Sequence, residues 1–182
     1  MHNMNILITG SPGTGKTTLV RTLCRRLEDF KPAGFYTQEI REKGKRLGFE
    51  LVSLDGPGMI LAHTGFSTDY KVGRYGVDAS GFDRFLERLS LEKTQTGLII
   101  IDEIGKMECF SQKFHALVNA ALVSPRPVLA TVAAKGGGLI AAVKKRPDVE
   151  VAELTLQNRN ELASELEMRI RSFLSGSASK DP

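Results

Sequence analysis

The stretch Gly10-Ser11-Pro12-Gly13-Thr14-Gly15-Lys16-Thr17, followed by Thr18, decides the fold of this chain. It matches the pattern G-x-x-x-x-G-K-[ST], in which glycines let a loop adopt positive φ angles and bring backbone N–H groups close to phosphates. Lys16 is expected to place its ammonium at the β- and γ-phosphates, and the Thr17 hydroxyl is expected to ligate Mg²⁺. A helix beginning here points the positive end of its dipole at the same phosphates. We therefore predict that residues 10–18 bind a nucleoside triphosphate.

Apolar periodicity on both sides of this loop indicates a strand before it and a helix after it. Residues 5–8 form a short apolar run typical of a buried strand, and a helix over 16–27 would gather its leucines on one face. Further strands are expected at 98–101, 128–132 and 149–154, and further helices at 79–89, 112–122, 139–145 and after a cap at Asn160. This alternation predicts an α/β fold of the P-loop NTPase type, doubly wound around a mainly parallel sheet.

One segment departs from the alternation. Residues 34–63 contain short strands separated by tight-turn signals, including a polar turn at 41–46, so we expect an antiparallel β-meander inserted into the fold. The whole of 1–174 is predicted to be one domain. Residues 175–182 are small and polar, and we predict that they form a disordered tail.

Bulk properties limit the classes of function. The 182 residues are 41% hydrophobic and 25% charged with a net charge of +4, which is ordinary for a single globular domain. No apolar run approaches the ~20 residues of a membrane helix and no signal peptide is evident, so we expect a cytoplasmic protein with no membrane partner. Nucleic acid binding is not expected, because Glu42 dilutes the basic turn and no aromatic residue there offers a stacking surface. The oligomeric state stays open.

An acidic pair ends the apolar run 98–101. The carboxyl ends of parallel strands line the ligand crevice of an open α/β sheet, so Asp102 is expected to hold Mg²⁺ beside Thr17. Glu103 follows directly, where a carboxylate can orient and deprotonate the attacking water. The alternative for Glu103 is a solvated loop residue.

An Asp-Glu pair is typical of the P-loop branch that has an extra strand between the P-loop strand and the Asp strand, by analogy of fold. Residues 128–132 would form that strand. Thr131 would then face the γ-phosphate or the attacking water as a sensor, or would be an ordinary strand residue.

Four cations are candidates for contacts to the nucleotide. Arg74, in a glycine-rich loop that we expect to fold over a ligand, and Lys106, three residues after Glu103, are predicted to stabilise charge in the transition state; Arg146 is a weaker candidate. Arg159 is predicted to stack on the nucleobase. For each of them the alternative is a solvated surface charge.

Several runs together resemble one known family. They are Gly10 to Thr17, Gly34-Phe35-Tyr36-Thr37-Gln38-Glu39-Ile40, Val72-Gly73-Arg74-Tyr75-Gly76-Val77-Asp78, Ile101-Asp102-Glu103-Ile104-Gly105-Lys106-Met107-Glu108 and Asn158-Arg159. The chain resembles the thermostable and cancer-related nucleoside-triphosphatase family from about residue 5 to 174. The resemblance implies hydrolysis of ATP, GTP and other triphosphates with Mg²⁺ and loose base selectivity, and nucleotide-binding segments at 10–17 and 98–105. This chain departs from the family pattern at Val132-Ala133, where a proline would follow Thr131, and at Asn160, where an acid would follow Arg159.

The residues themselves leave three functions open. A triphosphate hydrolase is favoured because Glu103 suits an attacking water. A nucleotide or small-molecule kinase is the second, although the sequence shows no arginine-rich lid and no evident acceptor pocket. The third is a nucleotide-dependent binding switch.

Overall fold

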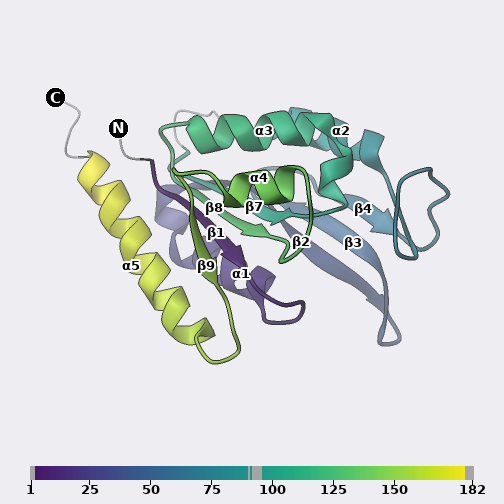
Figure 1. Cartoon of the computed structure of the whole chain (residues 1–182), viewed down its shortest axis with the longest axis horizontal. Coiled ribbons are helices and arrows are strands. Elements are labelled where there is room, and N and C mark those ends of the chain that lie inside the picture. Colours follow the sequence, from purple (N-terminus) through teal and green to yellow (C-terminus); the bar gives the residue numbers. More distant parts are fainter. Residues whose placement is uncertain (1–2, 90, 92–95, 179–182) are drawn as a thin grey trace.

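A single mixed sheet organises the chain. The structure, a computed structural model, describes residues 3–89, 91 and 96–178. In these residues nine strands form one sheet in the order β5-β6-β4-β3-β2-β7-β8-β1-β9 (Figure 1). The strands are β1 Asn5–Thr9, β2 Pro32–Glu42, β3 Lys45–Ser53, β4 Met59–His63, β5 Lys71–Val72, β6 Tyr75–Val77, β7 Leu98–Ile104, β8 Val128–Val132 and β9 Glu150–Glu153. The helices are α1 Lys16–Arg26, α2 Ala79–Arg88, α3 Gln112–Val123, α4 Leu139–Lys144 and α5 Arg159–Ala178, with 3₁₀ turns at Glu28–Phe30 and Glu108–Phe110.

One half of the sheet is parallel and carries the predicted P-loop architecture. Strands β2, β7, β8, β1 and β9 pair in parallel, and β8 lies between β1 and β7. The predicted strand at 128–132 is therefore the intervening strand. Because β1, β7 and β8 run the same way, their carboxyl ends meet at one edge, where the P-loop and the acidic pair lie.

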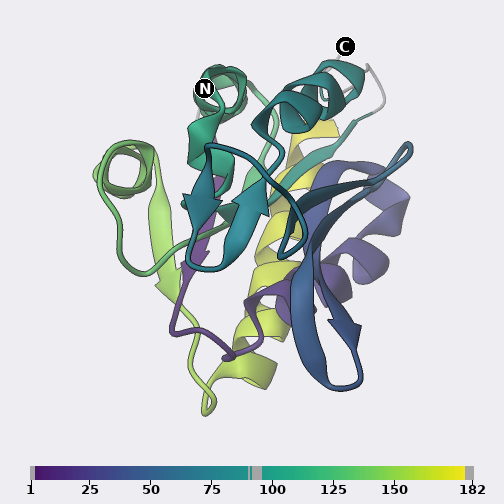
Figure 2. The same cartoon turned by 90° about the vertical axis from the view of Figure 1, so that its right-hand side faces the viewer.

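Helices cover both faces of the sheet, so two cores form (Figure 1 and Figure 2). Alternate residues of one strand supply both of them: Ile6 and Ile8 pack with α1 and α5, whereas Leu7 packs with α2, α3 and α4. The fold class predicted from the alternation is thus confirmed, including its doubly wound arrangement.

The other half of the sheet is antiparallel and longer than predicted. Strand β2 pairs in parallel with β7 through Pro32–Phe35 and then continues as the antiparallel partner of β3. The meander runs on through β4 to β6 at Val77, past the expected end at residue 63. The glycine-rich loop around Arg74, expected to fold over a ligand, is instead the turn of the β5–β6 hairpin, because β6 pairs with β4 and extends the sheet.

The predicted turn at 41–46 is also shorter in the structure. Arg41 pairs with Arg46 and Glu42 with Lys45, so the strands continue into the predicted turn. Only two residues, Lys43 (φ 46°) and Gly44 (φ 77°), connect them. Two successive positive φ angles are typical of the two-residue turns that match the twist of a hairpin.

The last helix corrects two predictions. It begins at Arg159, because the carbonyl of Asn158 accepts the hydrogen bond from Leu162 N; Asn160 lies inside the helix instead of capping it. Residues 175–178, predicted to be disordered, continue the helix, and 179–182 lie outside the described residues. Within the described part of the chain, no helix is both long and apolar enough to cross a bilayer.

Candidate active site

The P-loop has the geometry of an anion cradle. Gly13 (φ 82°) and Gly15 (φ 98°) take positive φ angles, and Gly15 leads into α1. The first turn of α1 carries no acidic residue, so the positive end of its dipole is not neutralised there. Nζ of Lys16 donates a 3.1 Å hydrogen bond to the carbonyl of Gly10, which keeps the ammonium against the loop. The Lys16 ammonium therefore lies against the loop that follows the carboxyl end of β1.

Asp102 is the point where four segments meet. Its Oδ2 accepts a 2.8 Å hydrogen bond from Thr17 Oγ1 and a 3.3 Å bond from the backbone N–H of Thr37. Its Oδ1 accepts a hydrogen bond from Thr131. The Thr37 hydroxyl also donates to the backbone carbonyl of Asp102, at 2.6 Å. The sequence analysis missed Thr37, although it lies in one of the runs that carry the family resemblance.

Burial dominates the electrostatics of the two predicted acids. Asp102 is 1% exposed, and its burial raises its pKa even though hydrogen bonds from Thr131, Thr17 and Thr37 act in the other direction. Burial also raises the pKa of Glu103, and the Lys16 ammonium opposes that rise. A nearby cation stabilises the charged form of a carboxylate in such an environment. With its raised pKa, the carboxylate is also a stronger base than an exposed one.

Two further residues at Glu103 were not predicted. Glu108 is buried, and its desolvation, reinforced by the charge of Glu103, raises its pKa to about 8. A Cβ at Gly105 would lie 2.8 Å from Oε2 of Glu108 and 2.9 Å from Oε1 of Glu103, so both carboxyl groups pack against this glycine. Lys144 of α4, held by the carbonyls of Ala133 and Ala134, lowers the pKa of Glu103 by its charge. Glu108 and Gly105 lie in one of the runs that carry the family resemblance, but no local pattern predicts their contacts with Glu103.

A cavity of about 330 Å³ opens beside this cluster. Thr17, Asp102 and Glu103 line one part of it, and Lys106 also lines it. The remaining wall comes from β2, β3, β5 and the segments after β7 and β8.

The other predicted residues divide between this edge and other parts of the molecule. Thr131 is fully buried and bound to Asp102, so its hydroxyl reaches the site through that carboxylate. Arg159 is exposed at the start of α5, in the segment after Leu154, whose carbonyl lies against Gly10 of the P-loop. Ser11, Pro12 and Thr18 are exposed along the loop.

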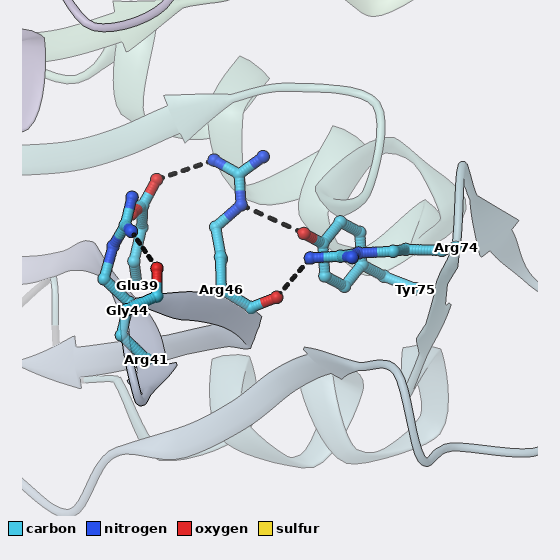
Figure 3. A network of polar contacts seen from close by, with 6 residues as sticks. All are labelled: Glu39, Arg41, Gly44, Arg46, Arg74 and Tyr75. Atoms are coloured by element: carbon cyan, nitrogen blue, oxygen red, sulfur yellow. Dashed lines mark hydrogen bonds and ion pairs between the residues drawn. The ribbon is translucent and has the colours of Figure 1, made fainter.

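Two of the predicted cations are engaged in contacts within the chain. Arg146 pairs with Asp148, whose carbonyl is bound by Asn5 at the start of β1, so Arg146 lies at the sheet edge opposite the P-loop and its assignment was wrong. Arg74 donates to the carbonyl of Arg46 and packs over the ring of Tyr75 (Figure 3). Arg74 therefore belongs to a network on the antiparallel half of the sheet. The sequence analysis had instead expected its loop to fold over a ligand.

The donor set suits Mg²⁺. A threonine hydroxyl and a buried carboxylate meet 2.8 Å apart beside a phosphate cradle, and hard oxygen donors are what Mg²⁺ binds in triphosphate sites. Thr17 and Asp102 are thus the residues that would hold the ion.

Comparison with known proteins agrees with this geometry. A family model described as NTPase matches residues 5–167. A curated relative, nucleoside-triphosphatase THEP1 of Thermotoga sp. (strain RQ2), is 46% identical over 90% of this chain and 93% of the relative. The cancer-related nucleoside-triphosphatase homolog of Mus musculus is 36% identical over 89% and 94%.

Two solved structures share the fold. The crystal structure of THEP1 from Aquifex aeolicus superposes with a TM-score of 0.80 at 37% identity, covering 90% of this chain and 96% of that chain. The solution structure of a human cancer-related nucleoside triphosphatase gives 0.77 at 33% identity, covering 93% and 98%. The family resemblance found in the sequence is confirmed: this chain belongs to the NTPase family.

Proposed function

We propose that this chain hydrolyses nucleoside triphosphates to the diphosphate and inorganic phosphate. The observation that carries the proposal is the meeting of Thr17 and Asp102 at 2.8 Å, with Glu103 next in sequence and the P-loop amides beside them. The names of the relatives, which are nucleoside-triphosphatases, support the same activity.

The roles proposed for the residues follow from this arrangement. The amides of residues 10–18 and the ammonium of Lys16 bind the phosphates and stabilise the charge that develops on them. Glu103 orients a water molecule toward the γ-phosphorus and accepts its proton as the bond to the β–γ bridging oxygen breaks. Lys106, at the rim of the cavity, is the cation available to the equatorial oxygens.

We propose Mg²⁺ as the cofactor, held by Thr17 and Asp102. When bound, it neutralises charge on the β- and γ-phosphates. Arg159 is proposed to stack on the base. Because the contacts proposed here go mainly to phosphates and metal, we expect broad base specificity, with ATP, GTP and other triphosphates as substrates.

The test compares phosphate release from ATP, GTP, CTP and UTP, with Mg²⁺ and after chelation. Glu103→Gln is expected to lower turnover about 10²–10⁴-fold, the usual contribution of a general base, while calorimetry still shows nucleotide binding. Glu42→Gln, at the exposed end of β2, is the matched control and should behave like the unaltered chain. Full activity of Glu103→Gln would remove the base assignment, and no phosphate release from any triphosphate would remove the proposed function.

A further inference from the structure

The cavity at the acidic pair extends beyond the groups that hydrolysis uses. Thr17, Asp102 and Glu103, where the ion, the γ-phosphate and the attacking water would lie, line only one part of its volume of about 330 Å³. That volume falls in the range of about 300–1,000 Å³ that is typical of sites for small organic ligands. Thr17 is the one P-loop residue in the lining of the cavity. The backbone amides of the loop, which are proposed to bind the phosphates, therefore lie outside the cavity.

One part of the cavity wall is apolar. This part of the wall consists of Phe49 of β3, Val72 of β5 and Met107 after β7. Their apolar side chains are not suited to binding phosphate or orienting water. Apolar walls with a few convergent polar groups are the usual composition of a small-molecule pocket. The space therefore suits the body of a second substrate whose reactive end reaches Glu103.

One residue of this wall, Phe49, packs against a network that joins three strands; Figure 3 shows the polar contacts of that network. The Arg46 guanidinium lies 5.0 Å from the centroid of the Phe49 ring, and that ring packs edge-on against Tyr75 at 5.2 Å. The same guanidinium donates to Glu39 at 2.6 Å and to the Tyr75 hydroxyl at 3.0 Å. Arg74 adds its bond to the Arg46 carbonyl. These contacts hold the Phe49 ring in place, and a binding wall that is held in place lowers the cost of binding.

The charges of the lining select the kind of molecule. Four carboxyl groups, those of Glu39, Asp102, Glu103 and Glu108, line the cavity, and in the described part of the chain no arginine does. Its two lysines, Lys106 and Lys135, are exposed. A second phosphate group would lie beside carboxylates without an arginine fork to bind it, so a nucleoside monophosphate is a poor fit. A neutral molecule with a hydroxyl group and an apolar face fits.

We propose that this cavity binds a small neutral alcohol with an apolar face and that the chain transfers the γ-phosphoryl group to it. The inference rests on the proposed function, because the same P-loop and Glu103 act in both reactions. The alcohol oxygen forms a bond to the γ-phosphorus while the bond to the β–γ bridging oxygen breaks. The hydroxyl proton passes to Glu103 and then to solvent. The products are a phosphate monoester, the nucleoside diphosphate and one proton.

The experiment measures how the phosphoryl group divides between alcohol and water. The full chain is incubated with ATP labelled at the γ-phosphate and with benzyl alcohol, pyridoxine, thymidine or glycerol, and labelled monoester and inorganic phosphate are separated by chromatography. We expect a monoester from at least one of the first three alcohols and much less from glycerol, which lacks an apolar face. Pyridoxine 5′-phosphate, with its added charge, should not be phosphorylated.

Two variants locate the acceptor. Met107→Trp narrows the cavity and should lower the ratio of monoester to inorganic phosphate by about tenfold, as expected when a pocket loses volume that the substrate needs. Val72→Phe narrows it from β5 and should act in the same direction, which keeps the test valid if one variant does not fold. Met168→Trp, at a position 66% exposed on α5, is the control and should leave the ratio unchanged.

The two proposals fail in different ways. Release of inorganic phosphate with no monoester from the three apolar alcohols would overturn the acceptor site and leave hydrolysis standing. A ratio unaffected by either narrowing variant would also overturn it. A chain that releases no phosphate and forms no monoester would overturn both.

Discussion

The hydroxyl of Thr131 donates a hydrogen bond to Oδ1 of Asp102, joining neighbouring strands β8 and β7 inside the protein. Thr131 is fully buried, so Thr131→Val leaves Asp102 with an unsatisfied buried oxygen. We expect a loss of roughly 1–3 kcal/mol in the free energy of unfolding, the usual cost of such a group, and slower phosphate release. Urea denaturation measures the first effect. Thr131→Ser keeps the hydroxyl and should retain most of the stability and most of the rate of phosphate release. A valine variant as stable as the unaltered chain would contradict the role assigned to this bond.

A second prediction concerns Gly105, where any side chain would push two carboxyl groups apart. Gly105→Ala brings its Cβ within 3 Å of oxygens of both Glu103 and Glu108, so these flexible side chains must move. Misplacing a catalytic group by about 1 Å can cost about 10²-fold, and we expect a 10–100-fold lower turnover with near-normal thermal stability. Gly137→Ala is the control, since nothing lies within 4 Å of its Cβ. A Gly105→Ala enzyme as active as this control would show that packing against Gly105 does not position the Glu103 side chain.

The buried carboxyl of Glu108 makes stability depend on pH. Its pKa rises from 4.5 to about 8 on folding, so between these values the unfolded chain binds fewer protons than the folded one. The free energy of unfolding must then fall as pH rises through this window, by up to about 1.4 kcal/mol per pH unit. Glu108→Gln removes this contribution. Denaturation of both chains at pH 5, 6, 7 and 8 should show the variant gaining stability relative to the unaltered chain as pH rises. If the two free energies of unfolding change in parallel with pH, Glu108 does not have a raised pKa in the folded chain.

The network in Figure 3 predicts the titration of Glu39. Burial tends to raise the pKa of this carboxyl, but hydrogen bonds from Arg46 and Arg41 outweigh it and hold the pKa below its ordinary value. In Arg46→Ala the pKa should rise, as read by NMR titration of the side chain, and stability should fall by roughly 1 kcal/mol as the cation–π contacts are lost. Arg46→Lys keeps the charge but not the planar guanidinium. Its Glu39 pKa and its stability should lie between those of the unaltered chain and those of the alanine variant. An unchanged Glu39 pKa in the alanine variant would argue against the network.

Sequence patterns predicted the parallel half of the fold well because its signals are local. The P-loop spacing, the apolar run before Asp102 and the helical periodicities each belong to one contiguous segment, and the structure confirms the intervening position of residues 128–132. The antiparallel half was harder. Strands β5 and β6 are only two and three residues long, so no period can be read from them, and their pairing depends on β4.

The site divides in the same way. Lys16, Thr17, Asp102 and Glu103 were predicted from motifs. Thr37 was not, because its role depends on a contact with a residue 65 positions away. The burial of Glu108 likewise depends on packing that no local pattern encodes. Arg146 was the weaker candidate, and its ion pair with Asp148 holds it at the edge of the sheet opposite the P-loop.

Strand β2 belongs to both halves of the sheet, and Phe35 is paired on each side, with Ile101 of β7 and with Ser53 of β3. A hinge between the nucleotide edge and the hairpin would have to break ladder hydrogen bonds at this residue. The two halves are therefore expected to behave as one rigid plate, and the distance from phosphate cradle to hairpin is fixed by the backbone. A molecule that reacts here therefore meets strand-borne walls whose spacing the sheet sets in advance.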